Sequence, residues 1–162
     1  MEKFWPFESF YKKRLNISEE ETQQIKLFIH NFKNSIDSNQ ITTYKKINPL
    51  TELQALKKLK NQIEEFLNDL NLDLDENWIQ LYKKENFHLP HTHVGSAYSG
   101  VIYIDGKTNE GTSFLDPQGN IYTSEFIKND LILFPSHIIH YVNFQQTDTN
   151  RIIISFNTKR RR

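Results

Sequence analysis

The sequence predicts a mainly β protein, in which a barrel or sandwich of short strands is covered by N-terminal helices. Over residues 1–75, apolar side chains recur at three- and four-residue intervals, which is typical of amphipathic helices. From Asn77 onward, short β-branched or aromatic runs alternate with turn residues, which indicates strands. Hydrophobic residues make up 37% of the chain and aromatic residues 13%, as in a packed globular protein. At 162 residues we expect one domain, with a helical buttress over 1–75 and a β core over 76–158.

Composition excludes several classes of function. The chain has no cysteine, which excludes a disulfide framework, a thiolate metal site and a cysteine nucleophile. Twenty basic residues balance twenty acidic ones, so we do not expect nucleic acid or a membrane surface as a partner. No run reaches the roughly 18 apolar residues of a membrane span, and the N-terminus has no apolar leader segment, so we expect a cytoplasmic protein. The basic run Lys159–Arg162 is expected to be a solvated tail.

The first helix is expected from about Glu19 to Ser35. Ser18 and Glu21 have the spacing of a capping box, which satisfies free backbone N–H groups at a helix start. The polar stretch Asp37–Gln40 should end the helix. The apolar positions that should face the core are Ile25, Phe28, Ile29 and Phe32.

A second amphipathic segment follows, with Thr51 as its expected cap. Lysine and glutamate side chains between its apolar positions should face water. We expect both helices to cover the outer face of a sheet. The apolar residues that share one face of this segment are Leu53, Leu56, Leu59, Ile63, Phe66, Leu67 and Leu70.

Six strands are expected in the second half of the chain, which is enough for a barrel or sandwich. Glycine, proline, asparagine and aspartate supply the breaks at Gly106–Gly111, Asp116–Asn120 and Gln145–Asn150. The expected strands are Trp78–Lys83, Tyr98–Ile104, Thr112–Leu115, Asp130–Phe134, His140–Phe144 and Arg151–Asn157.

Histidines are clustered in this half, in the motifs HLPHTH and SHIIH. In an extended segment, His91 and His93 project to the same side, and a closed barrel can bring His140 opposite them. Three imidazoles suit iron, zinc, copper or nickel and leave coordination positions open. The alternative is that these are surface or hydrogen-bonding histidines without a metal.

Four motifs in order carry a resemblance to a known family: HTHVGSAYSGVIYI, GTSFLDP, LILFPSHIIH and RIIISFN. Together they resemble the small bacterial and phage 2-oxoglutarate–Fe(II) oxygenases, a branch related to the prolyl hydroxylases. The resemblance covers roughly Trp78 to Asn157. It implies a double-stranded β-helix (jelly-roll, cupin-like) core buttressed by two or more helices. It also implies Fe(II) as cofactor, 2-oxoglutarate as co-substrate and O2 as oxidant.

The resemblance assigns roles by position. His91 matches the first metal-binding histidine and His140 the distal one, while Arg151 matches the basic residue that binds the remote carboxylate of 2-oxoglutarate. A planar guanidinium suits that task because it grips a carboxylate through two hydrogen bonds. Tyr103 matches a tyrosine that donates its hydroxyl to the same carboxylate. The alternatives are an exposed arginine at a strand mouth and a plain core tyrosine.

The chain departs from the family pattern at His93, where most members have aspartate or glutamate. The resemblance makes His93 the third ligand, although Asp116 or Asp105 could take that place. Asp116 precedes a proline and is alternatively a turn cap. Ile153 is the second departure, since related sequences often have serine there.

Two further histidines, His88 and His137, lie three residues before a proposed ligand. In extended chain that spacing favours a different face from the ligand. We expect His137 to be a pocket-rim or supporting residue.

These observations predict a 2-oxoglutarate- and Fe(II)-dependent oxygenase that hydroxylates an unactivated C–H bond of a peptide or small molecule. One alternative is a three-histidine cupin dioxygenase or isomerase that does not use 2-oxoglutarate. Another is a non-catalytic jelly-roll binding module without metal. The sequence specifies neither the substrate nor the oligomeric state.

Overall fold

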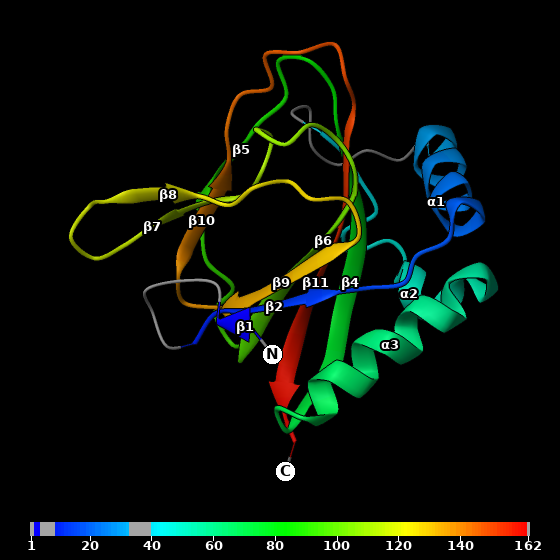
Figure 1. Cartoon of the computed structure of the whole chain (residues 1–162), viewed down its shortest axis with the longest axis horizontal. Coiled ribbons are helices and arrows are strands. Elements are labelled where there is room, and N and C mark those ends of the chain that lie inside the picture. Colours follow the sequence, from blue (N-terminus) through cyan, green and yellow to red (C-terminus); the bar gives the residue numbers. More distant parts are fainter. Residues whose placement is uncertain (1, 4–8, 33–39, 162) are drawn as a thin grey trace.

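The computed structural model describes residues 2–3, 9–32 and 40–161 and contains two antiparallel sheets with helices beside the larger one (Figure 1). The seven-stranded sheet has the order β1-β2-β9-β6-β11-β4-β3, and the four-stranded sheet has the order β5-β10-β7-β8. The larger sheet consists of β1 (Glu2–Lys3), β2 (Tyr11–Arg14), β3 (Ile41–Thr42), β4 (Leu72–Tyr82), β6 (Tyr98–Asp105), β9 (Asp130–Pro135) and β11 (Arg151–Arg160). The smaller sheet consists of β5 (His88–His91), β7 (Ser113–Leu115), β8 (Ile121–Thr123) and β10 (Ile139–Val142).

All six expected strands are present. Their ends are shifted by three residues or fewer, except that β4 starts at Leu72 and not at Trp78, and the short strands β1, β2, β3, β5 and β8 were not expected as such. The strand β2 has a charged sequence with no apolar alternation, YKKR, and it pairs with β9. Lys12 Nζ and Arg14 Nε each lie 2.8 Å from a carboxylate oxygen of Asp130. Asp130 is almost fully buried, so these two ion pairs hold the strand in place of an apolar face.

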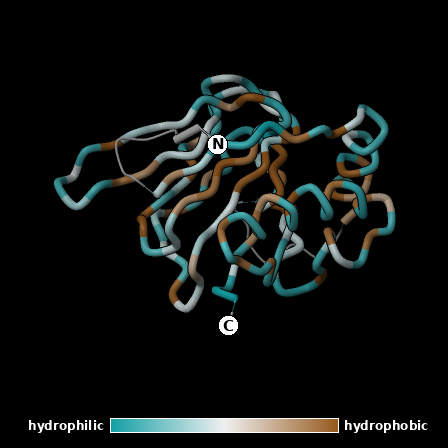
Figure 2. Tube along the Cα trace, turned by 60° about the horizontal axis from the view of Figure 1, so that its bottom comes forward, coloured by the Kyte–Doolittle hydropathy of each residue, from teal (hydrophilic) through white to brown (hydrophobic). Residues whose placement is uncertain are grey.

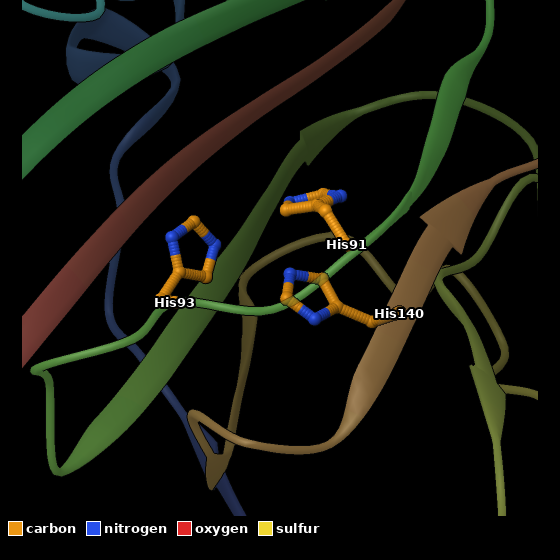
Figure 3. A group of neighbouring side chains, drawn as sticks. All are labelled: His91, His93 and His140. Carbon is orange, nitrogen blue, oxygen red and sulfur yellow. The ribbon is translucent and has the colours of Figure 1, made fainter.

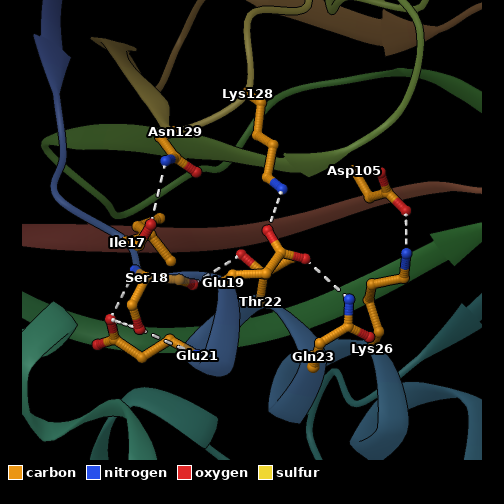
Figure 4. Close-up of polar contacts among 10 residues, drawn as sticks. All are labelled: Ile17, Ser18, Glu19, Glu21, Thr22, Gln23, Lys26, Asp105, Lys128 and Asn129. Atoms are coloured by element: carbon orange, nitrogen blue, oxygen red, sulfur yellow. Dashed lines mark hydrogen bonds and ion pairs between the residues drawn. The ribbon is translucent and has the colours of Figure 1, made fainter.

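Helix α1 (Glu19–Asn31) starts with the expected capping box (Figure 4). Ser18 Oγ accepts a hydrogen bond from the Glu21 backbone N–H, and Glu21 Oε2 accepts one from the Ser18 backbone N–H. Lys26 Nζ lies 2.6 Å from Asp105 Oδ2, which ties the helix to the end of β6. The backbone of Phe32 is already extended, and the expected helix end at Ser35 and the break at 37–39 lie outside the described residues.

The second helical segment begins earlier than expected and is interrupted. It consists of α2 (Pro49–Glu52), a 3-10 turn (Gln54–Leu56) and α3 (Lys57–Asn68). The prediction that Thr51 is the cap is wrong, because Thr51 lies inside α2 and Asn48 precedes its first residue. Pro49 occupies the first helical position, where its missing N–H costs nothing.

Two hydrophobic cores lie on opposite faces of the large sheet, as alternation along its strands requires. On β6, Ile102 and Ile104 pack with the helices, whereas Val101 and Tyr103 face the small sheet. Figure 2 shows the hydrophobic segments gathered in the central strands and the hydrophilic ones mostly in the outer loops. This alternation also decides which residues of β11 face the interior between the sheets.

The basic C-terminal residues are exposed but do not form a free tail. Lys159 and Arg160 are the last residues of β11, and Arg162 lies outside the described residues. Lys159 Nζ lies 2.8 Å from Asp75, and Arg161 lies 2.6 Å from Asp73. These ion pairs with β4 extend the strand beyond its apolar part.

In the ranges that the structure describes, none of the helices has both the length and the apolar character needed to cross a membrane.

Candidate metal centre and co-substrate pocket

Three histidines meet between the two sheets (Figure 3). His91 is the last residue of β5 and pairs directly with His140 on β10, while His93 follows two residues after β5. The ring centroids are 4.3 Å apart for His91 and His140, and 5.0 and 5.1 Å from His93 to His91 and His140. One ring nitrogen from each histidine lies within 4.8 Å of the other two. Such a group is compact enough to close on one metal ion.

Backbone carbonyls set the tautomer of two of these imidazoles. His91 Nδ1 lies 2.8 Å from the carbonyl oxygen of Leu89, and His140 Nδ1 lies 3.0 Å from that of Ile138. A carbonyl oxygen only accepts, so in both neutral rings Nδ1 carries the proton and Nε2 keeps a free lone pair. A metal-ligating histidine is commonly oriented in this way.

Burial keeps these imidazoles neutral. It lowers the pKa of His91, and it lowers the pKa of His140 well below its ordinary value, with a further contribution from neighbouring His91. The pKa of His93 falls to about 4, first through burial and then through the charge of His91. All three rings are therefore in the form that binds metal near neutral pH.

The donor set fits a divalent transition metal. Neutral imidazole suits iron, nickel, copper and zinc, and three protein ligands leave positions for a chelating ligand. In the described part of the chain the compact group contains only histidines, with no carboxylate. A bound divalent ion would therefore keep its full charge, which favours an anionic chelator.

The two aspartates considered as alternative ligands have other partners. Asp116 Oδ1 accepts hydrogen bonds from the backbone N–H groups of Gln118 and Asn120, at 2.9 and 2.8 Å. The side-chain hydrogen bond from Asn120 is the main cause that lowers the pKa of Asp116. Asp116 is therefore the turn cap, and Asp105 forms the ion pair with Lys26.

Two expectations are wrong: His88 does not lie on a different face from His91, and His137 is not at the pocket rim. A register shift between β5 and β10 turns His88 to the same side as His91, and the two rings stack at 4.2 Å with 17° between their planes. His88 Nδ1 also lies 3.2 Å from the hydroxyl of Tyr82. His137 is exposed in the turn before β10 and does not line the cavity.

Arg151, the first residue of β11, is completely buried rather than exposed at a strand mouth. Its Nε donates to the Glu110 carbonyl oxygen at 2.6 Å, and its Nη2 donates to Thr112 Oγ1 at 3.3 Å. The Tyr82 ring centroid lies 4.9 Å from its Cζ. Among the described residues Nη1 has no hydrogen-bond partner. Burial lowers the pKa of Arg151, yet arginine stays protonated in proteins. Nη1 is therefore a hydrogen-bond donor of a buried cation and has no acceptor.

Tyr103 is also completely buried and reaches the same threonine. Its hydroxyl donates to Thr112 Oγ1 at 3.1 Å, accepts from the Thr112 backbone N–H and contacts Ser124 Oγ. Thr112 therefore joins Tyr103 to Arg151. Neither Arg151 nor Tyr103 lines the cavity beside the histidines, whereas Thr112 and Tyr82 do.

The cavity beside the histidines has about 30 Å³ of space, enough for about two water molecules. Gln80 links two other polar residues of the cavity lining. Its Nε2 donates to the Tyr82 hydroxyl and its Oε1 accepts from Ser155 Oγ, both at 2.8 Å. The sequence did not point to Gln80, His88 or Thr112 as cavity residues, because only the strand register brings them together. Apolar residues, among them Val101, Phe134 and Ile153, complete the lining.

Comparison with solved structures identifies the architecture, although no protein-family model and no curated protein sequence matches the chain. A prolyl-4-hydroxylase from Pseudomonas putida is similar over 95% of this chain and 93% of its own, with TM-score 0.70 and 14% identity. A prolyl hydroxylase from Trichoplax adhaerens, in complex with a hypoxia inducible factor peptide fragment, is similar over 94% and 84%, with TM-score 0.72 and 12% identity. The chain has the fold of the prolyl hydroxylases.

The prolyl-hydroxylase fold confirms the jelly-roll core with helices outside it. A third similar structure widens the range of ligands that occur on this fold. HygX from Streptomyces hygroscopicus, solved with nickel, 2-oxoglutarate and hygromycin B bound, matches 93% of this chain and 82% of its own, with TM-score 0.69 and 9% identity.

Proposed function

We propose that this protein is an Fe(II)- and 2-oxoglutarate-dependent oxygenase that hydroxylates an unactivated C–H bond. The observation that carries the proposal is the pairing of two features in one β-sandwich. Three neutral imidazoles form a compact ligand group. A buried arginine with an unpaired donor, Arg151, contacts Thr112, which lines the same cavity. A metal group alone would fit many proteins, but the combination fits a metal chelated by a dicarboxylate.

In this proposal His91, His93 and His140 hold Fe(II), and bound iron with 2-oxoglutarate supplies the oxygen chemistry. The protein orients the metal ligands and encloses the site. The carbonyls of Leu89 and Ile138 fix two of the imidazoles, and the apolar part of the lining limits the cavity to about two water molecules.

Arg151 binds the far carboxylate of 2-oxoglutarate in this proposal. Nη1, which has no partner among the described residues, would donate one hydrogen bond to it, and Nη2 would donate a second on leaving Thr112 Oγ1. The Tyr103 hydroxyl now donates its single proton to Thr112 Oγ1, and it would become a third donor to the same carboxylate on turning away from Thr112. Because the cavity has room for about two waters, binding requires Thr112 and Tyr82 to move apart.

The proposed substrate is a peptide or a small molecule. The Trichoplax enzyme was solved with a peptide fragment and HygX with hygromycin B, so this fold accommodates both. The single-domain organisation and the cytoplasmic location stay predictions.

Anaerobic titration with Fe(II) and then with 2-oxoglutarate tests the proposal. We expect one Fe(II) per chain, followed by a charge-transfer absorbance that appears only when both iron and 2-oxoglutarate are present. His91→Ala or His140→Ala should abolish stoichiometric iron binding while circular dichroism stays unchanged. His137→Ala is the matched control, because its exposed side chain lies outside the group.

Three results would contradict the proposal. Undiminished iron binding in both alanine variants would rule out the ligand group. An iron-loaded protein that fails to bind 2-oxoglutarate at millimolar concentration would favour the three-histidine cupin. A protein that binds no metal at all would favour the jelly-roll binding module.

A further inference from the structure

A second hollow lies next to the metal centre, on the other side of Trp78. It is a cleft of about 300 Å³, formed by the turn before α2 and by the middle of β4. Trp78 lines both this cleft and the histidine cavity, and its ring lies 5.7 Å from that of His93. The cleft and the histidine cavity therefore adjoin each other at Trp78. The cleft is lined by Tyr44, Lys45, Lys46, Ile47, Asn48, Glu76, Asn77 and Trp78.

The turn that carries the two lysines is held firmly to the sheet. The Thr43 backbone N–H donates to the Ile79 carbonyl oxygen, and Thr43 Oγ1 accepts from the Ile79 N–H, at 3.1 and 3.0 Å. Lys45 has a φ of 57°, a left-handed conformation that is uncommon for a residue other than glycine. Residues held in such conformations are concentrated at ligand sites.

The aromatic side chains of the cleft are also fixed in place. Tyr44 packs edge-on against Trp78 at a centroid distance of 4.9 Å, and Lys45 Nζ lies 5.2 Å above the Tyr44 ring. This cation–π contact holds the ammonium group of Lys45 over the cleft wall. The wall is thus an aromatic surface with a positive charge on it.

Two cations and one buried donor of the cleft have no ion-pair or hydrogen-bond partner among the described residues, although Glu76 lines the same cleft. Lys45 and Lys46 are exposed, and neither forms an ion pair within the described ranges. Asn77 is 2% exposed, and its Oδ1 accepts from the Leu50 backbone N–H at 2.8 Å, which fixes the amide orientation. Its Nδ2 then has no partner among the described residues. A buried unpaired donor in the same cleft as two ammonium groups indicates a site for an anionic acceptor.

We propose that this cleft binds a carboxylate side chain of an acidic peptide substrate, so that a neighbouring peptide residue reaches the metal past Trp78. The inference rests on the proposed function for the fate of the peptide but not for its binding. A single carboxylate fits better than a nucleic-acid backbone, which needs a track of several cations. Here Glu76 lies in the same cleft as the two lysines, and the whole chain has zero net charge.

Fluorescence titration of the full chain with an N-acetylated, C-amidated tetraglutamate peptide tests this inference; all proteins compared carry Trp5→Phe, so that Trp78 is the one remaining tryptophan. The measurement is made on both metal-free and anaerobic Fe(II)-loaded protein. We expect saturable binding that weakens at least about tenfold in Lys45→Gln/Lys46→Gln, because both ammonium groups are lost. Lys57→Gln/Lys58→Gln on α3 is the matched control, with the same charge change at exposed residues outside the cleft, and should bind like the wild type.

A second variant separates binding from folding. Asn77→Asp keeps an oxygen acceptor for Leu50 N–H but replaces the unpaired donor with a negative charge, so it should remove tetraglutamate binding while the far-ultraviolet circular dichroism is retained. Tetralysine should not bind to the wild type.

Three outcomes would overturn the inference: no tetraglutamate binding at millimolar concentration, equal binding by the two lysine double variants, or tighter binding of the oligonucleotide dT4. These outcomes do not depend on 2-oxoglutarate. If lysine-dependent peptide binding is found but the iron-loaded protein does not bind 2-oxoglutarate, the inference about the cleft is kept and the oxygenase proposal fails. If 2-oxoglutarate binds but tetraglutamate does not, the oxygenase proposal stands and the cleft is overturned.

Discussion

At the scale of single residues, Arg151 carries a charge that nothing in its surroundings neutralises by direct contact. Two of its nitrogens donate to neutral oxygens, those of the Glu110 backbone and the Thr112 hydroxyl. The Glu110 carboxylate itself accepts from the Lys107 backbone N–H and the Thr147 hydroxyl. Burying a cation in this way is costly, and a dianionic ligand would offset much of that cost.

Truncation of this side chain should therefore affect the co-substrate and spare the metal. Arg151→Ala should weaken 2-oxoglutarate binding by about 2–5 kcal/mol, the range for removing one partner of a buried charge pair. Arg151→Lys should be intermediate, because it keeps the charge and loses the planar fork. Anaerobic calorimetry measures the dissociation constant of Fe(II) and, on the Fe(II)-loaded protein, that of 2-oxoglutarate. A large loss of iron affinity together with unchanged 2-oxoglutarate affinity would refute the assignment.

The third imidazole leads to a different expectation. His93 Nδ1 lies 3.5 Å from Asn157 Nδ2, a donor that a carboxylate at position 93 could use. His93→Asp should bind Fe(II) about tenfold tighter or better, because it adds a negative charge to a group that has none. His93→Asn, which adds no charge, is the control. A folded His93→Asp protein that binds no iron would disprove the positional equivalence.

At the scale of elements, the β5–β10 pair decides the contents of the site. Its register pairs His140 with His91 and then Val142 with His88, so two residues of β5 lie opposite Tyr141 alone. Strict alternation would place His88 and His91 on opposite faces, and the extra residue reverses that relation. A β-bulge is not visible in a four-residue strand sequence, which is why the expectation for His88 failed.

The same reasoning explains which elements could be predicted. The core strands β6, β9 and β11 contain apolar runs with clear boundaries, so the sequence located them to within a few residues. The strands β3 and β8, with two and three residues, exist only because neighbouring strands offer free backbone groups. The HTH spacing pointed to the histidine pair, but the contact of Thr112 with Arg151 depends on pairing between segments 39 residues apart.

The capping box of α1 provides a test at this scale. Ser18→Ala removes the oxygen that accepts from Glu21 N–H, and should lower the free energy of unfolding by about 1 kcal/mol. Ser18→Asp should restore most of this loss, because aspartate is an equally good N-cap. Urea denaturation measures the change. Iron affinity should stay constant in both variants, because α1 lies outside the two sheets that carry the histidines, and altered iron affinity would show that the helix does more than buttress the sheet.

For the whole molecule, the depressed histidine pKa values couple stability to pH. The pKa of His93 is about 4 in the folded chain and about 6.5 when unfolded, so between these values only the unfolded state takes up the proton. The free energy of unfolding of the metal-free protein should therefore fall as pH drops from about 7. The loss from His93 alone is about 1 kcal/mol by about pH 5.5, and His91 and His140 act in the same direction.

Urea denaturation at about pH 7 and at about pH 5.5, with a chelator present, measures this dependence of stability on pH. His93→Gln should show a smaller pH dependence than the wild type. Equal stability of the wild type at both values would mean that the imidazoles are not buried as described.

The two carbonyl contacts at the metal centre also bear on how this site tolerates sequence drift. Leu89 and Ile138 each orient a histidine two positions further along the chain through the main chain, not through the side chain. A supporting aspartate or asparagine can be lost in one mutational step, whereas every residue type presents a carbonyl oxygen. The exposed position 89 is therefore free to vary, and position 138 is limited only by the packing of its side chain against the core, while the imidazoles keep their orientation. A site supported in this way can survive in lineages whose sequences have diverged almost everywhere else.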